Sequence, residues 1–363
     1  MIKVFKFGGS LLSDPQKMCK VVSEIHSEKP TLVIISALKG MTNRLEELCM
    51  LLYQGKLKAA QKQFEDIKQD HITFRSELPL FLDLHENLEK MIFDELDQLC
   101  SSKLDQLICS TYDQVLSCGE RLSSLYLHSQ LENSKLFDSR DYIKTDSNFS
   151  NAKLDWDSTR KAFREFELEP DKLYISQGFI ASDLSGSTTT LGREGSDYSA
   201  TIYSNLMKAN QVRIYTDVDG VFSTDPKKII DAKTIPQLHF DEAHTFAKNG
   251  AKVLYPRTIE PLREIQTDLI VCSLDSSSGG TKINSSGPEK GFKGLIFNSH
   301  PTKGLLELIL VGCFDKEMVK AMEADYKITA RSFDRHEIIT VVSIEESLES
   351  TAQNWHQKLF LNT

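Results

Sequence analysis

The sequence has 363 residues, of which 40% are hydrophobic and 26% are charged, and its formal net charge is −9 at pH 7. This balance is typical of a folded globular protein and excludes a disordered or fibrous chain. The negative charge argues against nonspecific nucleic-acid binding, which needs a basic surface to neutralise phosphates. At this length we expect one large domain and one smaller domain.

The N-terminus and the cysteines indicate a cytoplasmic protein. The first residues, MIKVFKFGG, form a strand pattern rather than a secretion signal, and no later stretch stays apolar long enough to span a bilayer. The seven cysteines are scattered and form no C-x-x-C pair, so neither a disulfide framework nor a zinc site is indicated. None of the nine histidines lies in an H-E-x-x-H pair, which disfavours zinc hydrolysis.

The N-terminal part alternates strands, glycine turns and helices. Residues 2–7 (IKVFKF) predict a strand, Gly8 and Gly9 a turn, and residues 11–26 a helix. Residues 31–36 (TLVIIS) predict a second strand. From about residue 46 to residue 132 the apolar residues recur at three- and four-residue spacing, which predicts a helical lobe.

Strand patterns return further along the chain and alternate with helical stretches. Strands are predicted at 172–176, 212–216 and 268–273, and a helix at 241–252. Strands separated by helices imply a mostly parallel sheet with helices on both faces. The small polar residues of 276–287 (SSSGGTKINSSG) predict a linker.

The C-terminal part predicts a small α+β domain. Strands are expected at 304–312 and 337–344, and helices at 315–325 and 348–359. A domain of this size would gain stability from a partner surface. We therefore predict a large domain over residues 1–287, including the helical lobe, and a second domain over residues 288–363.

The first segment whose residues could bind a ligand or take part in a reaction is Lys6-Phe7-Gly8-Gly9-Ser10. Two glycines between a strand and a helix let backbone N–H groups approach a phosphate, and a helix N-terminus and Lys6 add positive charge. The segment does not match the Walker pattern, and a glycine pair after a strand is often only a tight turn.

The second segment, Thr188 to Ala200 (TTTLGREGSDYSA), combines hydroxyls, glycines, one arginine and one aspartate before a helical run. Arginine binds carboxylates through two parallel hydrogen bonds, and hydroxyls and backbone donors can surround an anion. The alternative is a polar turn in which Ser196 or Asp197 is a helix N-cap.

The third segment, Tyr215 to Lys227 (YTDVDGVFSTDPK), follows a predicted strand and is rich in acids and hydroxyls. Such a loop can hold a nucleotide base, a ribose and magnesium. It lacks the EF-hand spacing, and the alternative is an Asp-Gly turn between strands. Two single residues are weaker candidates. Glu120 could bind a substrate ammonium group and Lys252 could bind phosphates, although a single charged residue is more often a surface residue.

Together these segments resemble the aspartate kinase branch of the amino acid kinase family. Seven segments match that family's signatures in order, and they cover nearly the whole region before the predicted linker. They are KFGGS, SALKGMTN, SCGERLS, QGF, TTTLGREGSDYSA, YTDVDGVFSTDPKK and GAKVLYPR.

The resemblance implies a three-layer αβα sandwich and direct, magnesium-assisted phosphoryl transfer from ATP to L-aspartate, the first step of the aspartate-derived amino acid pathway that leads to lysine through diaminopimelate. It also implies a homodimer or higher homo-oligomer, with no nucleic-acid or membrane partner. Arg193 would bind the α-carboxylate and Glu120 the α-ammonium group, while Lys6 would be catalytic and Asp197 would orient it. The implied ATP contacts are Lys6, Phe7, Gly8, Gly9, Thr216, Asp217, Phe222, Lys227, Lys252 and Val253, and the implied aspartate contacts are Thr42, Glu120, Arg193, Glu194, Gly195 and Ser196.

The sequence departs from the family pattern at several positions. Ser10 replaces the usual threonine, Phe222 a tyrosine and Lys227 an arginine, whereas Glu194 replaces a glycine and places a carboxylate beside the site of an acidic substrate. The family usually has two ACT domains after the catalytic domain, but only about one such length remains here. We therefore expect a reduced ACT-like domain that serves regulation or dimer contacts.

Two other functions are compatible with these residues. One is a related kinase that acts on glutamate, N-acetylglutamate or a nucleotide, although SCGERLS and TTTLGREGSD favour aspartate. The other is a catalytically silent paralogue, suggested by Glu194 and the short C-terminus.

If Lys6 is purely catalytic, its replacement by alanine should lower kcat with little unfolding.

Overall fold

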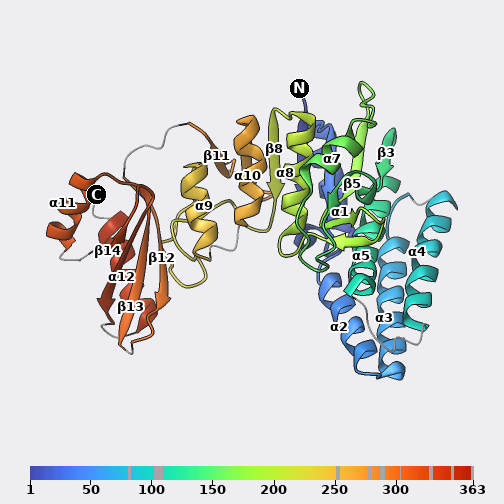
Figure 1. The fold of residues 1–363 in the computed structure, drawn as a ribbon, viewed down its shortest axis with the longest axis horizontal. Coiled ribbons are helices and arrows are strands. Elements are labelled where there is room, and N and C mark those ends of the chain that lie inside the picture. The colour runs from blue at the N-terminus through green and yellow to red at the C-terminus, as the bar shows by residue number, and fades with distance from the viewer. Residues whose placement is uncertain are drawn as a thin grey trace. The chain divides into compact units, whose positions relative to one another are not determined.

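The computed structural model divides into two compact units, Met1–Asp217 and Val218–Thr363 (Figure 1). The domain boundary expected after residue 287 stays a prediction. The structure describes residues 1–80, 83–101, 109–250, 254–276, 279–286, 291–302, 304–326, 330–344 and 347–360.

A parallel sheet forms the centre of the first unit. Its strands lie in the order β3 (Ser134–Phe137), β5 (Leu173–Gln177), β2 (Leu32–Ile35), β1 (Lys3–Phe7) and β8 (Gln211–Tyr215), and each is parallel to its neighbours. Phe7 of β1 lies opposite Ile35 of β2 and Tyr215 of β8, so these three strands end in register. The loops that follow them therefore emerge at one edge of the sheet.

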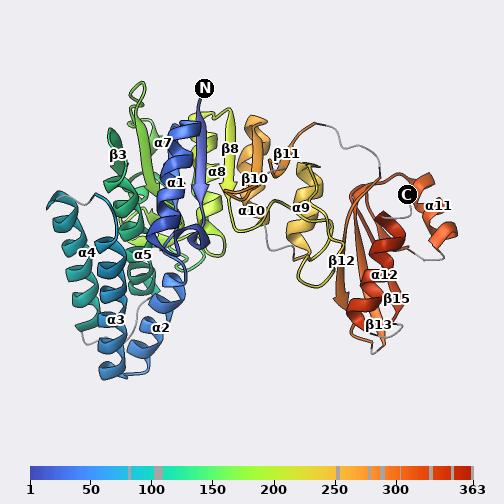
Figure 2. The same ribbon diagram turned by 180° about the vertical axis from the view of Figure 1, so that it is seen from behind.

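Helices cover both faces of this sheet, as Figures 1 and 2 show for α1 (Pro15–Glu28) and α8 (Gly195–Met207). Side chains alternate along β1 because successive residues of a strand point to opposite faces. Phe5 and Phe7 pack against Tyr215, whose hydroxyl donates to Glu24 of α1, while Lys6 faces α8. The predicted three-layer αβα architecture is confirmed.

The first helix starts later than the sequence predicted. A short 3₁₀ helix, η1 (Gly9–Leu12), follows the glycines, and α1 begins only at Pro15. The Asp14 side chain accepts a hydrogen bond from the Lys17 N–H at 2.9 Å and so caps the helix. Proline is favoured at the first helical position because it has no N–H to leave unpaired there, so the Asp-Pro pair sets the start.

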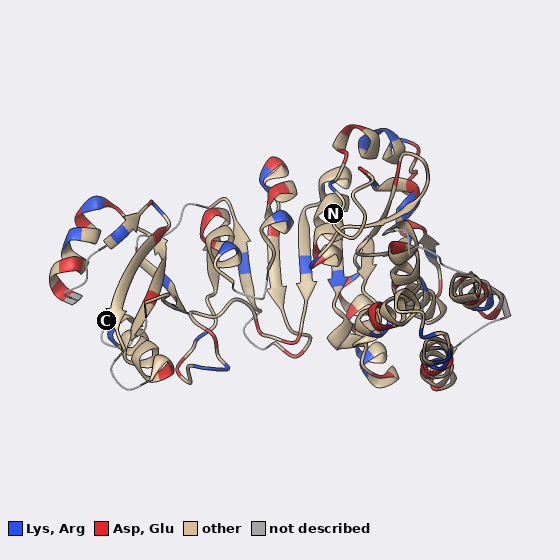
Figure 3. Cartoon of the chain, turned by 60° about the horizontal axis from the view of Figure 1, so that its bottom comes forward, with Lys and Arg blue, Asp and Glu red and all other residues tan. Residues whose placement is uncertain are grey.

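In the described part of the helix-periodic stretch, four helices pack side by side (Figures 1 and 2). They are α2 (Met41–Tyr53), α3 (Leu57–Ser76), α4 (Asp83–Ser101) and α5 (Cys109–Ser129). Figure 3 shows acidic and basic residues interspersed along the described chain, as in the Lys62–Asp66 pair one turn apart on α3. Within the described residues, no helix combines the length and apolar character needed to cross a membrane.

A small second sheet completes the first unit. Strand β6 (Ile180–Asp183) pairs with β4 (Lys144–Thr145) and with β7 (Thr188–Thr190). Two short helices, α6 (Ser139–Tyr142) and α7 (Trp156–Phe163), precede β6 in the chain.

The second unit begins with a smaller group of strands and helices. Strand β11 (Thr281–Asn284) pairs antiparallel with β10 (Asp268–Cys272) and parallel with β9 (Gln237–His239), and two helices, α9 (Phe240–Lys248) and α10 (Pro256–Ile265), connect β9 to β10. The prediction of a linker over 276–287 was therefore wrong at its centre. Gly279 and Gly280 both adopt positive φ, which lets the chain reverse tightly enough for β11 to pair with β10.

The rest of the described part of the second unit combines an antiparallel sheet with two helices, in agreement with the α+β composition expected from the sequence. The sheet has the order β12 (Gly291–Ser299), β13 (Leu305–Cys313), β15 (Glu337–Ser343) and β14 (Ala330–Phe333). The helices are α11 (Lys316–Tyr326) and α12 (Leu348–Phe360), and Trp355 of α12 belongs to a core that includes Leu308 and Leu310. The sequence analysis identified β13, α11, β15 and α12 but did not predict β12 or β14.

Candidate active site

A cavity of about 600 Å³ lies in the first unit, where β1, β2 and β8 end. Parallel α/β sheets bind ligands at this edge because the loops after several strands meet there, and the volume is typical of a small-molecule site. Ten residues that the sequence analysis singled out line it: Lys6, Gly8, Gly9, Thr42, Glu120, Arg193, Glu194, Gly195, Ser196 and Thr216.

A buried ion pair lies at the base of the cavity. The Lys6 Nζ atom on β1 lies 2.6 Å from the Asp197 Oδ1 atom in the first turn of α8. The two side chains are only 8% and 5% exposed, so water screens their attraction weakly. The aspartate therefore fixes the ammonium group at the cavity, the arrangement expected for an orienting residue.

The glycine pair brings the backbone close to the loop after β2. A Cβ atom on Gly9 would lie 2.8 Å from the Ala37 carbonyl oxygen, so only glycine fits there without a shift. The Gly8 N–H donates to the Tyr215 carbonyl at 3.1 Å, which ties the turn to β8. The turn leads into η1 beside the Lys6 ammonium, and this combination suits the oxygens of a phosphate chain.

Glu120 on α5 contributes a carboxylate that is only 3% exposed. Its Oε1 atom accepts a hydrogen bond from the Ala37 N–H at 3.3 Å, and Oε2 has no hydrogen-bond partner among the described residues. Burial raises the pKa of this carboxyl to about 8, although the nearby Lys6 charge lowers it in part. A buried, unpartnered carboxylate oxygen at a cavity wall is suited to a cationic ligand group.

Glu194 lies on the exposed rim of the cavity, directly before α8. Its φ of 53° is in the left-handed region, which favours glycine. Surrounding protein atoms raise its pKa by desolvation and the Asp197 charge raises it further, while Lys6 and Arg193 act in the opposite direction. An anionic substrate would therefore meet a like charge at this rim.

We expect the Glu194→Gly variant to bind L-aspartate, the substrate that the family resemblance implies, more tightly. Removing the carboxylate removes a repulsion on the order of 1 kcal/mol, so KM for aspartate should fall about fivefold. Glycine relieves the left-handed backbone strain, which stabilises the folded state by roughly 1 kcal/mol. Glycine also gives the unfolded chain more freedom, which costs roughly the same amount. The melting temperature should therefore change little. Steady-state kinetics and thermal unfolding measure the two effects.

Two matched variants separate charge from backbone. Glu194→Gln removes the charge but keeps the strained backbone, and it should also lower KM. Lys208→Gly changes another positive-φ residue, at the far end of α8, and should leave KM unchanged. An unchanged KM in Glu194→Gln would show that the carboxylate does not face the bound substrate.

Several cavity residues were missed by the sequence analysis, and Asp113 is the most informative residue near them. Its fully buried carboxylate accepts hydrogen bonds from the Ser150 N–H (2.9 Å) and from the Thr190 N–H and hydroxyl (2.8 and 3.0 Å), which fixes two residues that line the cavity. Asp113 precedes Glu120 by two helical turns on α5, a spacing that could have indicated a shared face. The lining residues that lie outside every segment quoted in the sequence analysis are Glu46, Tyr112, Leu116 and Ser150.

The remaining predicted residues lie elsewhere. The Phe7 side chain is fully buried and stacks on Tyr215 at a ring distance of 4.7 Å, so only its backbone can contribute to a phosphate site. Asp217 is exposed at the end of the first unit, where it accepts a hydrogen bond from Thr216. Phe222 and Lys227 belong to the second unit, and Lys252 and Val253 lie outside the described residues.

The three-layer αβα architecture, with a cavity that combines a lysine, a glycine turn and carboxylates, defines the class of phosphate-binding α/β enzymes. The model of the amino acid kinase family matches residues 1–273. The chain belongs to the amino acid kinase family.

Curated relatives narrow the comparison. The chain is 32% identical to an aspartokinase of Chlamydia pneumoniae over 85% of this chain and 70% of the relative. It is 36% identical to an aspartokinase of Chlamydia trachomatis, over 74% of this chain and 61% of the relative. The chain thus spans about two thirds of the length of these relatives.

Solved structures agree with the fold. The structure of Escherichia coli aspartokinase III with lysine and aspartate has a TM-score of 0.84 at 24% identity and covers 99% of both chains. The structure of the same enzyme with aspartate and ADP has a TM-score of 0.83, again at 24% identity. At this identity the likeness establishes the architecture.

Proposed function

We propose that this protein is an aspartate kinase, which transfers the γ-phosphoryl group of ATP to the side-chain carboxylate of L-aspartate and releases ADP and 4-phospho-L-aspartate. The observation that carries the proposal is the charge pattern of the cavity where β1, β2 and β8 end. It places the Lys6–Asp197 pair, the buried Glu120 carboxylate and Arg193 around one space. An amino acid with two carboxylates and one ammonium group complements this pattern.

We assign the substrate contacts from these charges. Arg193 would bind the α-carboxylate through its planar guanidinium group, and Glu120 would accept hydrogen bonds from the α-ammonium group. Thr42, Gly195 and Ser196 line the same cavity and would complete the aspartate site. The charge of Glu194 would weaken binding without preventing it, because this carboxylate lies on the exposed rim.

The nucleotide would lie against the turn after β1 and the loop after β8. Gly8, Gly9 and Lys6 would contact the phosphates, and Thr216 would contact the nucleotide. Phe7 would take part through its backbone, and Asp217, Phe222, Lys227, Lys252 and Val253 remain proposed nucleotide contacts.

Magnesium fits this site as an ion carried by the nucleotide, because Mg²⁺ prefers phosphate oxygens and water and needs few protein ligands. When bound, it neutralises part of the phosphate charge. The chain itself would orient the reactants. One oxygen of the aspartate side-chain carboxylate bonds to the γ-phosphorus, and the bond from that phosphorus to the β,γ-bridging oxygen breaks. The attacking carboxylate is already an anion, so no general base is required, and Lys6 would offset the charge between the two anions.

The reaction is tested with purified protein, Mg²⁺-ATP and L-aspartate, with hydroxylamine present to trap the acyl phosphate. We expect aspartate-dependent hydroxamate and equimolar ADP, and no hydroxamate from glutamate. ATP binding without turnover of any amino acid would favour a silent paralogue, and turnover of glutamate alone would favour the related kinase.

A cytoplasmic location, a place in lysine biosynthesis and a homodimeric or larger assembly are part of the same proposal. The second domain proposed over residues 288–363 would act as a reduced ACT-like domain in regulation or in dimer contacts. A monomeric mass in sedimentation velocity would remove the assembly from the proposal, and adding lysine or threonine to the assay tests for feedback.

A further inference from the structure

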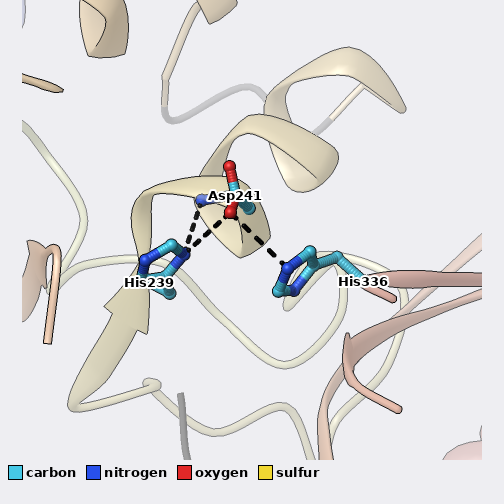
Figure 4. Close-up of side chains that lie close together, drawn as sticks. All are labelled: His239, Asp241 and His336. Carbon is cyan, nitrogen blue, oxygen red and sulfur yellow. Dashed lines mark hydrogen bonds and ion pairs between the residues drawn. The ribbon is translucent and has the colours of Figure 1, made fainter. Parts of the chain in front are cut away.

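Three side chains of the second unit converge on one another, as Figure 4 shows. His239 is the N-cap of α9, Asp241 lies in the first turn of that helix, and His336 lies directly before β15. The Asp241 Oδ2 atom lies 3.1 Å from His239 Nδ1 and 3.5 Å from His336 Nε2. One ligand atom from each of the three residues lies within 4.8 Å of the others.

The other hydrogen bonds of the two rings fix which nitrogens bear protons. His336 Nδ1 lies 3.2 Å from the Gly312 carbonyl oxygen, which can only accept, so Nδ1 is the protonated nitrogen and Nε2 has the lone pair. His239 Nδ1 accepts the Asp241 N–H at 3.2 Å, so this nitrogen is unprotonated, and a bound cation would take the place of that hydrogen bond. Two unprotonated nitrogens and a carboxylate oxygen therefore lie close to one another, an arrangement that a cation between them would stabilise.

The distances suit a transition metal ion. Bonds of about 2.0–2.2 Å in a tetrahedral site place neighbouring ligand atoms roughly 3.3–3.6 Å apart, close to both measured separations from Asp241 Oδ2. Imidazole nitrogen with one carboxylate oxygen favours Zn²⁺ and similar ions over Mg²⁺. Such a site would be separate in chemistry from the magnesium that accompanies ATP.

The surroundings resemble the outer shell of protein metal sites. A ligating histidine usually donates its second ring N–H to a carbonyl or carboxylate, as His336 donates to Gly312. A ligating carboxylate usually has its second oxygen hydrogen-bonded, and Asp241 Oδ1 lies 2.7 Å from Arg263 Nη1. The positive charges of Arg263 and of the α9 N-terminus repel a cation. The negative charges of the Asp241 and buried Glu242 carboxylates offset this repulsion.

We propose that His239, Asp241 and His336 bind one Zn²⁺ ion or a similar divalent transition metal ion, with water at the fourth position. The ion would join the start of α9 to the turn before β15 and so stabilise the second unit. Short motifs in the sequence do not reveal it, because the third ligand comes from a distant part of the chain.

The test is a calorimetric titration of the full chain with zinc chloride, after dialysis against a chelator and in the absence of nucleotide. We expect one ion per chain and a higher melting temperature with zinc. The His336→Gln and Asp241→Asn variants should each lose at least about tenfold in affinity and most of the thermal shift. The control His26→Gln changes an exposed histidine of α1 and should behave as the wild type.

A second measurement needs no variant of the site. The Co²⁺ form of the wild-type protein should show a visible ligand-field band and paramagnetically shifted N–H signals from two imidazole rings, with no thiolate charge-transfer band. Metal-free wild type that binds no zinc would overturn the proposal. So would binding that survives both site variants, or cobalt spectra that indicate cysteine ligands.

Discussion

Replacing Lys6 by alanine is expected to lower kcat about 10²–10³-fold, because the variant loses a fixed positive charge where two anions react. From the sequence we expected this variant to cause little unfolding, but the structure indicates a loss of stability. Asp197 lies 2.6 Å from Lys6 and is only 5% exposed, so the variant leaves a buried, unpaired carboxylate. Breaking such a pair typically costs about 3–5 kcal/mol of stability. Steady-state kinetics and chemical denaturation measure the two losses.

Two further variants separate catalysis from folding. The double variant Lys6→Met, Asp197→Asn removes both charges and should recover most of the stability but none of the turnover. Lys3→Ala changes the other lysine of β1, whose ion pair with Glu28 is partly exposed, and should keep kcat. A Lys6→Ala variant whose kcat stays within about threefold of the wild type would contradict a catalytic role for this residue.

The Glu120→Gln variant is expected to raise KM for aspartate by roughly ten- to a hundredfold, with a smaller effect on kcat. A hydrogen bond to a charged group contributes about 1.5–3 kcal/mol, and glutamine keeps the shape of the side chain without its charge. The KM value should respond more than kcat because the ammonium group takes no part in bond breaking. An unchanged KM would place the ammonium group elsewhere in the cavity.

Glu120 also predicts a pH dependence. Because its pKa in the folded protein is about 8, the carboxyl of the free enzyme is protonated near neutral pH and must ionise to pair with an ammonium group. We therefore expect kcat/KM for aspartate to rise with pH towards about 8, and Glu120→Gln to flatten this rise. Glu89→Gln is a matched control, because this carboxyl is also buried with a raised pKa but does not line the cavity.

The same pKa has a consequence for stability, and its sign is opposite to that of most carboxylates. The folded state binds the Glu120 proton more tightly than the unfolded chain, since the pKa rises from 4.5 to about 8 on folding. This contribution to the free energy of unfolding is fully present below pH 4.5 and is lost as the pH rises through about 8. The difference between wild type and Glu120→Gln should follow that curve in denaturation at several pH values.

The sequence by itself determined the class of fold and most of the cavity. Short apolar runs that end in glycine or hydroxyl residues predicted β1, β2 and β8, because a buried parallel strand must be apolar and its turn must be tight. Lys6, Glu120 and the 193–196 stretch were found because each lies in a short segment with a distinctive composition. Ten of the residues assigned to ATP or aspartate contacts line the cavity.

The tertiary structure decided what depends on contacts between distant segments. Asp113 contacts the cavity wall through residues that are 37 and 77 positions away, so the local spacing from Glu120 could indicate a shared helix face but not these contacts. The pairing of β11 inside the expected linker depends on the neighbouring strands β10 and β9, because a segment of polar residues becomes a strand only when its backbone groups find partners. The packing of β1 against α8 buries the Lys6–Asp197 pair. Because the pair is buried, the contact that orients Lys6 is also needed for stability.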